Sequence, residues 1–290
     1  MKYIFAVSGG PDSMAMLDMF KRKALAVCVV NYNKRPDSSK DVEIVVKYCQ
    51  EHNIKYYVKE IDKKFYKNQQ NINFQTLARE IRYNFFAEIA KIEQNNHVFV
   101  AHNLNDDLET AHMQFARDSK ALFYGIRPKN EVFGLKIKRP VIHLKKQTLL
   151  RYCEEKGINY AIDSSNEQDI YERNKVRKLI NSWDNDELIQ FRTKVRKYNK
   201  QNKKNDKLII KNFKKWCNLG FEVSFWSKFT DEQKYYLIYE FLKFHLEKNN
   251  NRNKIAAIID FILKTSQNKQ YRLENNKFLA IIDNKLIIMK

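Results

Sequence analysis

The sequence predicts an α/β protein with a doubly wound parallel sheet, followed by a smaller and mainly helical domain. Two observations predict this fold class. Short, continuous apolar runs alternate with helical stretches through the first half of the chain, as expected when both faces of a parallel sheet are covered. The second half becomes basic, aromatic and helical in its spacing. A chain of 290 residues is long enough for one large domain and a smaller one.

The expected elements alternate regularly. We expect strands at 3–7, 25–31, 55–60, 97–101 and 135–139, and helices at 12–22, 39–52, 74–93, 105–116 and 144–156. The first domain is expected to span residues 1–185 and the second residues 186–290. The chain should finish with short strands at 270–274, 277–282 and 285–289, joined by turns at Asn275–Asn276 and Asp283–Asn284. Because ligands of doubly wound sheets bind beyond the carboxyl ends of the strands, the segments after the first, second and fourth strands are the candidate site.

The strongest local signal is the loop between the first strand and the first helix, formed by Ser8, Gly9, Gly10, Pro11, Asp12 and Ser13. The two glycines permit positive φ, and Asp12 and Ser13 are expected to cap the helix. A helix N-terminus attracts anions, and two serine hydroxyls add donors. The loop therefore predicts phosphate binding, with a plain capped turn as the alternative. It lacks the Gly-Lys-Ser/Thr of a Walker A loop.

Composition points to a polyanionic partner. Lys and Arg total 54 against 34 acidic residues, a formal charge of +20. With only 6 Gly and 4 Pro, part of this charge also fits AT-rich coding sequence, so its distribution matters more than the total. Between Arg192 and Lys215, eleven residues are basic and only Asp206 is acidic. This local stripe is the better indication of a nucleic-acid surface.

The cysteines and the apolar runs exclude several classes of protein. Cys28, Cys49, Cys153 and Cys217 are far apart and form no CxxC pair, which argues against a disulfide framework, structural zinc or an iron–sulfur site. No apolar run approaches the length of a membrane span, and we see no signal peptide. We therefore expect a cytoplasmic protein without a membrane partner.

A second polar segment, residues 101–110, follows the fourth expected strand. His102 lies at the end of this strand, and the helix that follows carries Asp106, Asp107 and Glu109. Acids in a first helical turn can merely complement the helix dipole. Opposite a phosphate loop, however, they suit Mg²⁺ coordination or capture of an ammonium group.

Arginines form a third feature. Arg79 and Arg82 share a helical face with Tyr83 and Phe86. Arg173 and Arg177 are i, i+4 neighbours on a later helix. Each of these arginines, taken alone, is compatible with either a ligand contact or a solvated surface.

The loop at 8–13 resembles the pyrophosphate loop of the N-type ATP pyrophosphatases, which split ATP between its α and β phosphates. Other segments stand in the order seen in the tRNA(Ile)-lysidine synthetase family: NYNKRPDS (31–38), AREIRY (78–83), AHNLNDDLET (101–110), Arg139-Pro140, DSSN (163–166) and RNKVR (173–177). The resemblance covers roughly residues 1–180. It implies a Rossmann-like ATP pyrophosphatase domain followed by an RNA-binding part. It also implies conversion of the wobble cytidine of a CAU-anticodon isoleucine tRNA to lysidine, with ATP and free L-lysine.

The resemblance also implies roles for residues. The loop at 8–13 and His102 would bind ATP, and Asp12 and Asp106 would hold Mg²⁺. Asp12, Asp106, Glu109, Arg79 and Arg173 would be catalytic, with Asp106 or Glu109 orienting the lysine amine and accepting its proton. Asn105 stands where the family usually shows the first of two Asp residues, which leaves Asp106 as the matching acid.

Two other functions remain open at this stage. One is another tRNA-modifying ATP pyrophosphatase, such as a thiolase, although the cysteine pairs of such enzymes are missing. The other is an RNA-binding protein that retains nucleotide without catalysis; the intact Ser8, Asp12, Ser13 and Asp106 argue against it.

Overall fold

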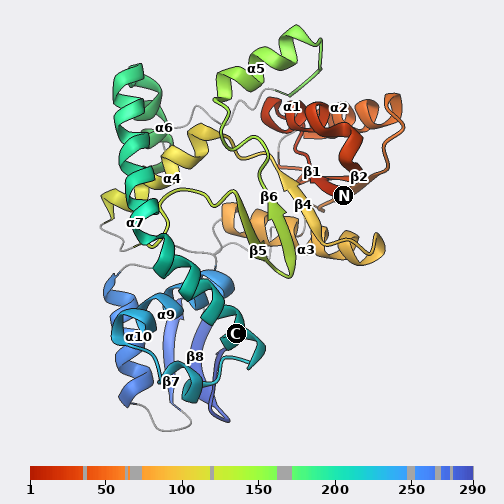
Figure 1. Cartoon of the computed structure of the whole chain (residues 1–290). Coiled ribbons are helices and arrows are strands. Elements are labelled where there is room, and N and C mark those ends of the chain that lie inside the picture. The colour runs from red at the N-terminus through yellow and green to blue at the C-terminus, as the bar shows by residue number, and fades with distance from the viewer. Residues whose placement is uncertain are drawn as a thin grey trace. The chain divides into compact units, whose positions relative to one another are not determined.

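The computed structural model divides into two compact units (Figure 1). The first contains residues 1–113 and 125–188, and the second residues 114–124 and 189–290. The division into domains at 185/186 stays a prediction. The structure describes residues 1–34, 38–62, 65, 74–117, 121–161, 172–246, 252–264, 269–274 and 277–289.

A six-stranded sheet with the order β3-β2-β1-β4-β6-β5 forms the centre of the first unit. Its strands are β1 (Tyr3–Ala6), β2 (Ala24–Asn31), β3 (Tyr56–Glu60), β4 (His97–Val100), β5 (Lys129–Val132) and β6 (Leu135–Lys138). All neighbouring pairs are parallel except β5 and β6. The expected fold class is thus confirmed, and the five expected strands are present. The antiparallel edge strand β5 was not predicted, because the segment KNEV is short and half exposed and lacks an apolar run.

Helices pack against both faces of this sheet. The helices between residues 11 and 182 are α1 (Pro11–Phe20), the short 3₁₀ helix η1 (Lys21–Lys23), α2 (Ser38–Glu51), α3 (Phe74–Ile92), α4 (Leu104–Ala116), α5 (Lys146–Glu155) and α6 (Glu172–Ser182). Phe5, Val27 and Phe99 pack in one core with residues of α1, α2 and α5. Their strand neighbours Ile4 and Val98 pack in a second core with α3. Since successive strand residues face opposite cores, both faces are apolar, which produces the continuous apolar runs in the sequence.

The topology brings the candidate segments to one edge of the sheet. β1 and β4 are parallel neighbours, as are β4 and β6. Their carboxyl ends therefore place residues 7–10, 101–103 and Arg139 side by side, at the edge where doubly wound sheets bind ligands.

The second unit combines helices with a small antiparallel sheet. Its elements are α7 (Asn185–Asn218, most of which belongs here), α8 (Val223–Trp226), α9 (Asp231–Leu246), α10 (Arg252–Lys264), β7 (Gln270–Glu274), β8 (Lys277–Ile282) and β9 (Lys285–Met289). Trp216, Phe241 and Leu279 are part of its core, which joins the helices to the sheet. The expected turn at Asp283–Asn284 is present, with left-handed φ at both residues, as a two-residue hairpin turn requires. The turn at 275–276 lies outside the described residues.

The segment 114–124 belongs to the second unit through specific contacts. The Asn199 side chain accepts a hydrogen bond from the Tyr124 amide (2.8 Å) and donates one to the Tyr124 carbonyl (2.9 Å). Phe115 contacts the Tyr198 ring of α7 edge-on, with ring centroids 5.4 Å apart. Within the residues described, no helix is both long and apolar enough to cross a membrane.

Candidate active site

The loop after β1 turns sharply because of one glycine. Gly9 has a φ of +83°, and a Cβ there would lie 2.7 Å from the backbone oxygen of Asp41 in α2. A side chain at position 9 is therefore excluded both by conformation and by the close approach of α2. Gly10 has an ordinary φ of −72° and is the N-cap of α1. Of the two glycines, Gly9 uses the positive φ that glycine permits and Gly10 does not.

Ser8 and Ser13 meet at the N-terminus of α1. The Ser13 hydroxyl donates to the Gly10 carbonyl (2.9 Å) and accepts a hydrogen bond from the Ser8 amide (3.2 Å). The Ser8 and Ser13 hydroxyl oxygens are 3.3 Å apart. Ser8 is exposed, whereas Ser13 is buried. This arrangement orients an accessible hydroxyl at a helix N-terminus, which suits a bound phosphate group.

Asp12 lies inside the first turn of α1 and is not its cap, contrary to the expectation. Gly10 is the N-cap, no side chain caps this helix, and Pro11 follows it. The Asp12 Oδ1 atom is buried and has no hydrogen-bond partner among the described residues. Burial and the nearby Asp106 carboxylate raise the pKa of Asp12 to about 6, although Lys146, Asn103 and Arg177 oppose the shift. The two aspartates therefore lie close enough to repel each other.

The start of α4 is a capping box, in which a cap and the third helical residue bond to each other. The Asp106 amide donates to Asn103 Oδ1 (3.0 Å), and the Asn103 amide donates to Asp106 Oδ2 (3.1 Å). Asn103 is buried and also hydrogen-bonds the Asp12 carboxylate. Because its Oδ1 faces the Asp106 amide, its side-chain amino group is the donor to Asp12. Asn103 thus links the two aspartates.

Two arginines of α6 neutralise the acids of α4. Arg173 donates from Nη2 to Asp106 Oδ1 (2.9 Å) and from Nε to Glu109 Oε2 (2.8 Å). Arg177 donates from Nε to Glu109 Oε1 (2.9 Å). Glu109 is buried, so both of its oxygens are paired inside the protein. Burial raises the pKa of Asp106, although Arg173 opposes the shift.

The neighbouring acid Asp107 has a different task. Its Oδ1 accepts a hydrogen bond from the Ile126 amide (2.6 Å), and a Cβ at Gly125 would lie 2.3 Å from the same oxygen. Asp107 therefore holds the backbone at residues 125–126. The acids associated with the α6 arginines are Asp106 and Glu109.

His102 follows β4 and contacts Arg139, which follows β6. The Arg139 Nε donates to His102 Nδ1 (2.8 Å). Burial and the positive charges of Arg139, Arg79, Arg173 and Arg82 hold the pKa of His102 well below its usual range. His102 is therefore a neutral imidazole in this site. The Arg79 guanidinium lies 4.5 Å from the Tyr83 ring centroid, on the α3 face that approaches His102.

The structure thus brings most of the predicted residues together. One connected group contains Asp12, Asp106, Glu109 and Arg173. The positive charges of Arg79 and Arg173 also lower the pKa of His102. Arg82, on the same helix as Arg79, is exposed. The expected segment 163–166 lies outside the described residues. Sequence reasoning missed the role of Asn103, for which the Asn-x-x-Asp pattern of a capping box was the available signal.

The donor set at Asp12 fits a magnesium ion. Asp12 has an orphaned buried carboxylate oxygen, and Asp106 is its neighbour. No group of three or more His, Cys, Asp or Glu side chains suited to a metal occurs among the described residues. Two carboxylates without a complete protein cage match Mg²⁺, which is commonly bound by one or two carboxylates together with phosphates and water.

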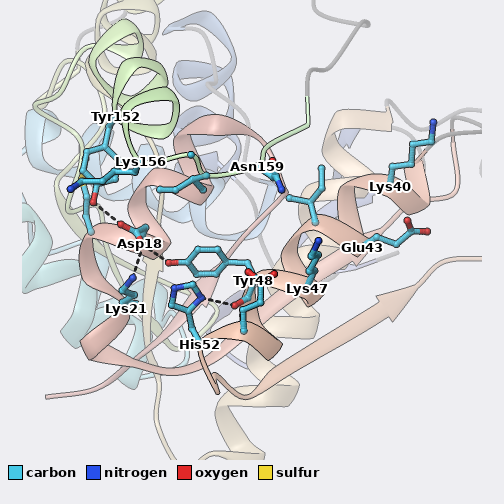
Figure 2. Close-up of a pocket in the computed structure, with 15 residues that line it drawn as sticks. Asp18, Lys21, Lys40, Glu43, Lys47, Tyr48, His52, Tyr152, Lys156 and Asn159 are labelled. Atoms are coloured by element: carbon cyan, nitrogen blue, oxygen red, sulfur yellow. Dashed lines mark hydrogen bonds and ion pairs between the residues drawn. The ribbon is translucent and has the colours of Figure 1, made fainter.

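A cavity of about 820 Å³ lies between α1, α2 and the end of α5, outside this group of residues (Figure 2). At one end, Asp18 accepts hydrogen bonds from Lys21 (2.8 Å), Tyr48 (2.5 Å) and Tyr152 (2.6 Å). Burial opposes ionisation of Asp18, but these donors outweigh it and lower the pKa to about 2. Asp18, one of the acids that line this cavity, is therefore already satisfied by the protein.

Comparisons with known proteins agree with the geometry. Residues 1–183 match the family model described as the PP-loop domain. The chain is 46% identical over 288 residues to a tRNA(Ile)-lysidine synthase of Ureaplasma parvum, covering 99% of this chain and 86% of the relative. It is 39% identical over 289 residues to a tRNA(Ile)-lysidine synthase of Malacoplasma penetrans, covering 99% and 98% of the two chains.

A solved structure supports the fold alone. A U34-tRNA thiolase from Methanococcus maripaludis superposes with a TM-score of 0.56 at 16% identity, over 70% of this chain and 73% of that one. The PP-loop match and the full-length relatives are the stronger findings, because they cover the phosphate loop, the α4 acids and the α6 arginines in one sequence. The chain belongs to the tRNA(Ile)-lysidine synthase family of PP-loop enzymes.

Proposed function

We propose that this enzyme joins free L-lysine to C2 of the wobble cytidine of a CAU-anticodon tRNA(Ile), at the expense of ATP. The observation that carries the proposal is the connection of two half-sites through buried side chains. Asn103 and the Asp12–Asp106 proximity link the phosphate loop to the acids of α4. One half suits ATP cleavage, and the other suits capture of an amine.

In the first step, the cytidine O2 attacks the α phosphate of ATP, and pyrophosphate leaves. The Ser8 hydroxyl and the N-terminus of α1 would receive the departing phosphates. His102, which is neutral, would donate a hydrogen bond to a phosphate oxygen, and the Arg79 guanidinium would offset negative charge. The wobble base has to leave its stack to reach this loop.

Asp12 and Asp106 would hold Mg²⁺ in this step. Among the described residues, Asp12 Oδ1 has no hydrogen-bond partner that a cation would displace. A bound cation would also relieve the repulsion between the Asp12 and Asp106 carboxylates. A magnesium ion at these carboxylates would neutralise charge that develops on the phosphate oxygens.

In the second step, the lysine Nζ attacks C2 and AMP leaves with the O2 atom. The ammonium group of lysine has to lose a proton before it can attack. Asp106 and Glu109 are the candidate acceptors, and each is held in position by Arg173. Arg173 would also be available to the lysine carboxylate, since arginine binds carboxylates with a planar fork of donors.

The tRNA would dock on a basic face of α7. Arg196, Lys200 and Lys203 begin a row that continues with Lys207, Lys211 and Lys214, at spacings of three or four residues, and all six side chains are exposed. Lys194 lies outside this row, because it is two residues from Arg196, and its Nζ lies 4.7 Å from the centroid of the Phe115 ring. Phosphate contacts by such a row give most of the affinity for nucleic acid.

A salt titration tests this face. Neutralising Lys200, Lys203 and Lys207 should weaken tRNA binding and reduce the slope of log affinity against log salt by roughly one for each lysine–phosphate pair removed. Neutralising Lys228, Lys243 and Lys264, outside α7, is the control and should leave the slope unchanged. An unchanged slope in the first triple variant would mean that tRNA docks elsewhere.

The decisive experiment incubates the enzyme with tRNA(Ile), ATP and labelled lysine, followed by nucleoside analysis. We expect lysidine and equimolar AMP and pyrophosphate. A tRNA thiolase would leave lysine unused and introduce sulfur. Three of the thiols do not favour that chemistry, since burial raises the pKa of Cys28, Cys49 and Cys153. An RNA-binding protein without catalysis would show no tRNA-dependent exchange of pyrophosphate into ATP.

A further inference from the structure

Arg139 makes an unusual set of hydrogen bonds for a buried cation. Its Nε donates to His102 Nδ1 (2.8 Å), and its Nη1 donates to the Arg127 carbonyl (2.8 Å) and to Asn130 Oδ1 (2.6 Å). Tyr83 also hydrogen-bonds the guanidinium. Arg139 is 5% exposed, and all of these hydrogen-bond partners are neutral; the Asp107 carboxylate acts on the guanidinium through its charge. Burying a charge on neutral acceptors costs free energy, so stability alone is a poor reason for this arrangement.

The contact with His102 has a definite chemical consequence. A guanidinium keeps its protons in proteins, so Arg139 Nε can only donate. His102 Nδ1 must then be the acceptor and carries no proton. In a neutral imidazole the remaining proton is on Nε2, which becomes a hydrogen-bond donor. Among the described residues, no group hydrogen-bonds Nε2.

We propose that Arg139 is a positioning residue that locks His102 as the Nε2–H tautomer, so that the site presents a neutral donor to the phosphates of ATP. The role of His102 as a phosphate donor rests on the proposed function, whereas the tautomer does not. Arg139 acts through His102.

The edge strand β5 helps to hold the Arg139 guanidinium in place. Asn130 lies within β5, and residue 127 precedes it, so the hairpin of β5 and β6 holds the Arg139 fork from one side. The charged groups that act on His102 are Arg139, Arg79 and Arg82 of α3, and Arg173 of α6. All four are cations, and each disfavours a second proton on the imidazole. The lock should therefore persist across the range, about pH 5 to 8, in which histidine ordinarily titrates.

Nitrogen NMR of histidine-labelled protein without ligands tests the lock directly. The His102 signals are assigned by their loss in His102→Gln. We expect a single Nε2–H tautomer with no titration between about pH 5 and 8. A proton on Nδ1, or a doubly protonated ring in that range, would overturn the proposal.

Substitutions separate the hydrogen bond from the charge of Arg139. Arg139→Lys keeps a cation, but its single nitrogen cannot occupy both the Nε position that faces His102 and the Nη1 position that faces Arg127 and Asn130. We expect mixed tautomers in this variant, while a lysine variant with the tautomer unchanged would show that charge alone is sufficient. Asn130→Ala removes one anchor of the guanidinium and should give a smaller change, which keeps the test usable if Arg139→Lys folds poorly. Lys129→Gln, an exposed neighbour on β5, is the control and should leave the signals unchanged.

Binding of ATP gives the functional readout. Loss of one charge-assisted hydrogen bond predicts about tenfold weaker ATP binding in Arg139→Lys, with the KM for lysine unchanged. An equal loss for ATP and lysine would indicate general disruption and contradict a positioning role. If the wild-type enzyme has the expected tautomer but makes no lysidine, the proposed function fails while the tautomer lock stands.

Discussion

Helix α1 carries two aspartates whose environments differ sharply. Asp18 accepts hydrogen bonds from Lys21, Tyr48 and Tyr152, and its pKa is lowered to about 2. Asp12, nearly two turns earlier, keeps one buried oxygen without a partner among the described residues, and its pKa is raised to about 6. A satisfied acid stabilises the fold, whereas an unsatisfied buried acid costs stability and is typical of a functional site. The comparison favours a structural role for Asp18 and supports the proposal that Asp12 is catalytic.

We expect Asp12→Asn to reduce catalysis more than any of the substitutions that follow. The change removes the charge that would hold Mg²⁺, and we expect ATP–pyrophosphate exchange to fall by about 10²–10³ or more. Stability should change in the opposite direction. The raised pKa means that folding penalises the ionised form above about pH 6, so the variant should be more stable at pH 7, on the order of 1 kcal/mol after allowance for partial exposure. Below about pH 4 the difference should vanish, because Asp12 is then protonated in both states.

Urea unfolding at both pH values and the exchange assay check this prediction. A well-folded Asp12→Asn enzyme with near-normal exchange would remove Asp12 from the mechanism. A variant that is less stable at pH 7 would show that the carboxylate makes a stabilising interaction.

The next effect separates the two steps of the reaction at Asp106. Asp106→Asn keeps the shape of the side chain and its place in the capping box but loses the charge. If Asp106 positions the lysine amine, transfer of lysine should fall about 10²-fold, with a smaller loss of pyrophosphate release. Single-turnover measurements of both products make the comparison. Equal loss of the two steps would indicate that Asp106 acts mainly through Mg²⁺, as Asp12 does.

A smaller effect is expected for Asn103→Asp, which tests the link between Asp12 and Asp106. Aspartate remains a good N-cap, so α4 should keep its start. It cannot donate to Asp12, and we expect exchange to fall by roughly tenfold, the value of one hydrogen bond to a charged group. Asn103→Ala, which loses the cap as well, should also destabilise the protein by about 1 kcal/mol. If Asn103→Asp had full activity, the donor to Asp12 would be dispensable.

The smallest effect on activity is expected for Asp18→Asn, the counterpart of Asp12→Asn. Exchange should stay within about twofold, because the cavity beside Asp18 lies outside the site. The lowered pKa means that Asp18 contributes stability above about pH 4, which is lost as pH falls through about 2. The variant should therefore be about 1–2 kcal/mol less stable at pH 7. Loss of exchange without loss of stability would reverse the assignments of the two aspartates.

Local sequence predicted much of this site. The strand, the glycine turn and the start of α1 are consecutive, so their pattern predicts the loop without tertiary contacts. The same holds for His102 and the acids of α4, which lie within one strand–turn–helix segment. The sequence did not predict β5, because it is a short edge strand with little buried surface that is stabilised by its pairing with β6.

The doubly wound fold and the chemistry available at the carboxyl edge of the sheet could be predicted from the chain alone, because apolar runs, Gly9 and clustered acids act over a few residues. The different environments of the acids, in contrast, arise from contacts between distant segments. Tyr152 reaches Asp18 across 134 residues, Arg173 reaches Glu109 across 64, and Arg139 reaches His102 across 37. Protonation depends on burial and on partners brought together by folding, so two aspartates on one helix have pKa values shifted in opposite directions, lowered at Asp18 and raised at Asp12.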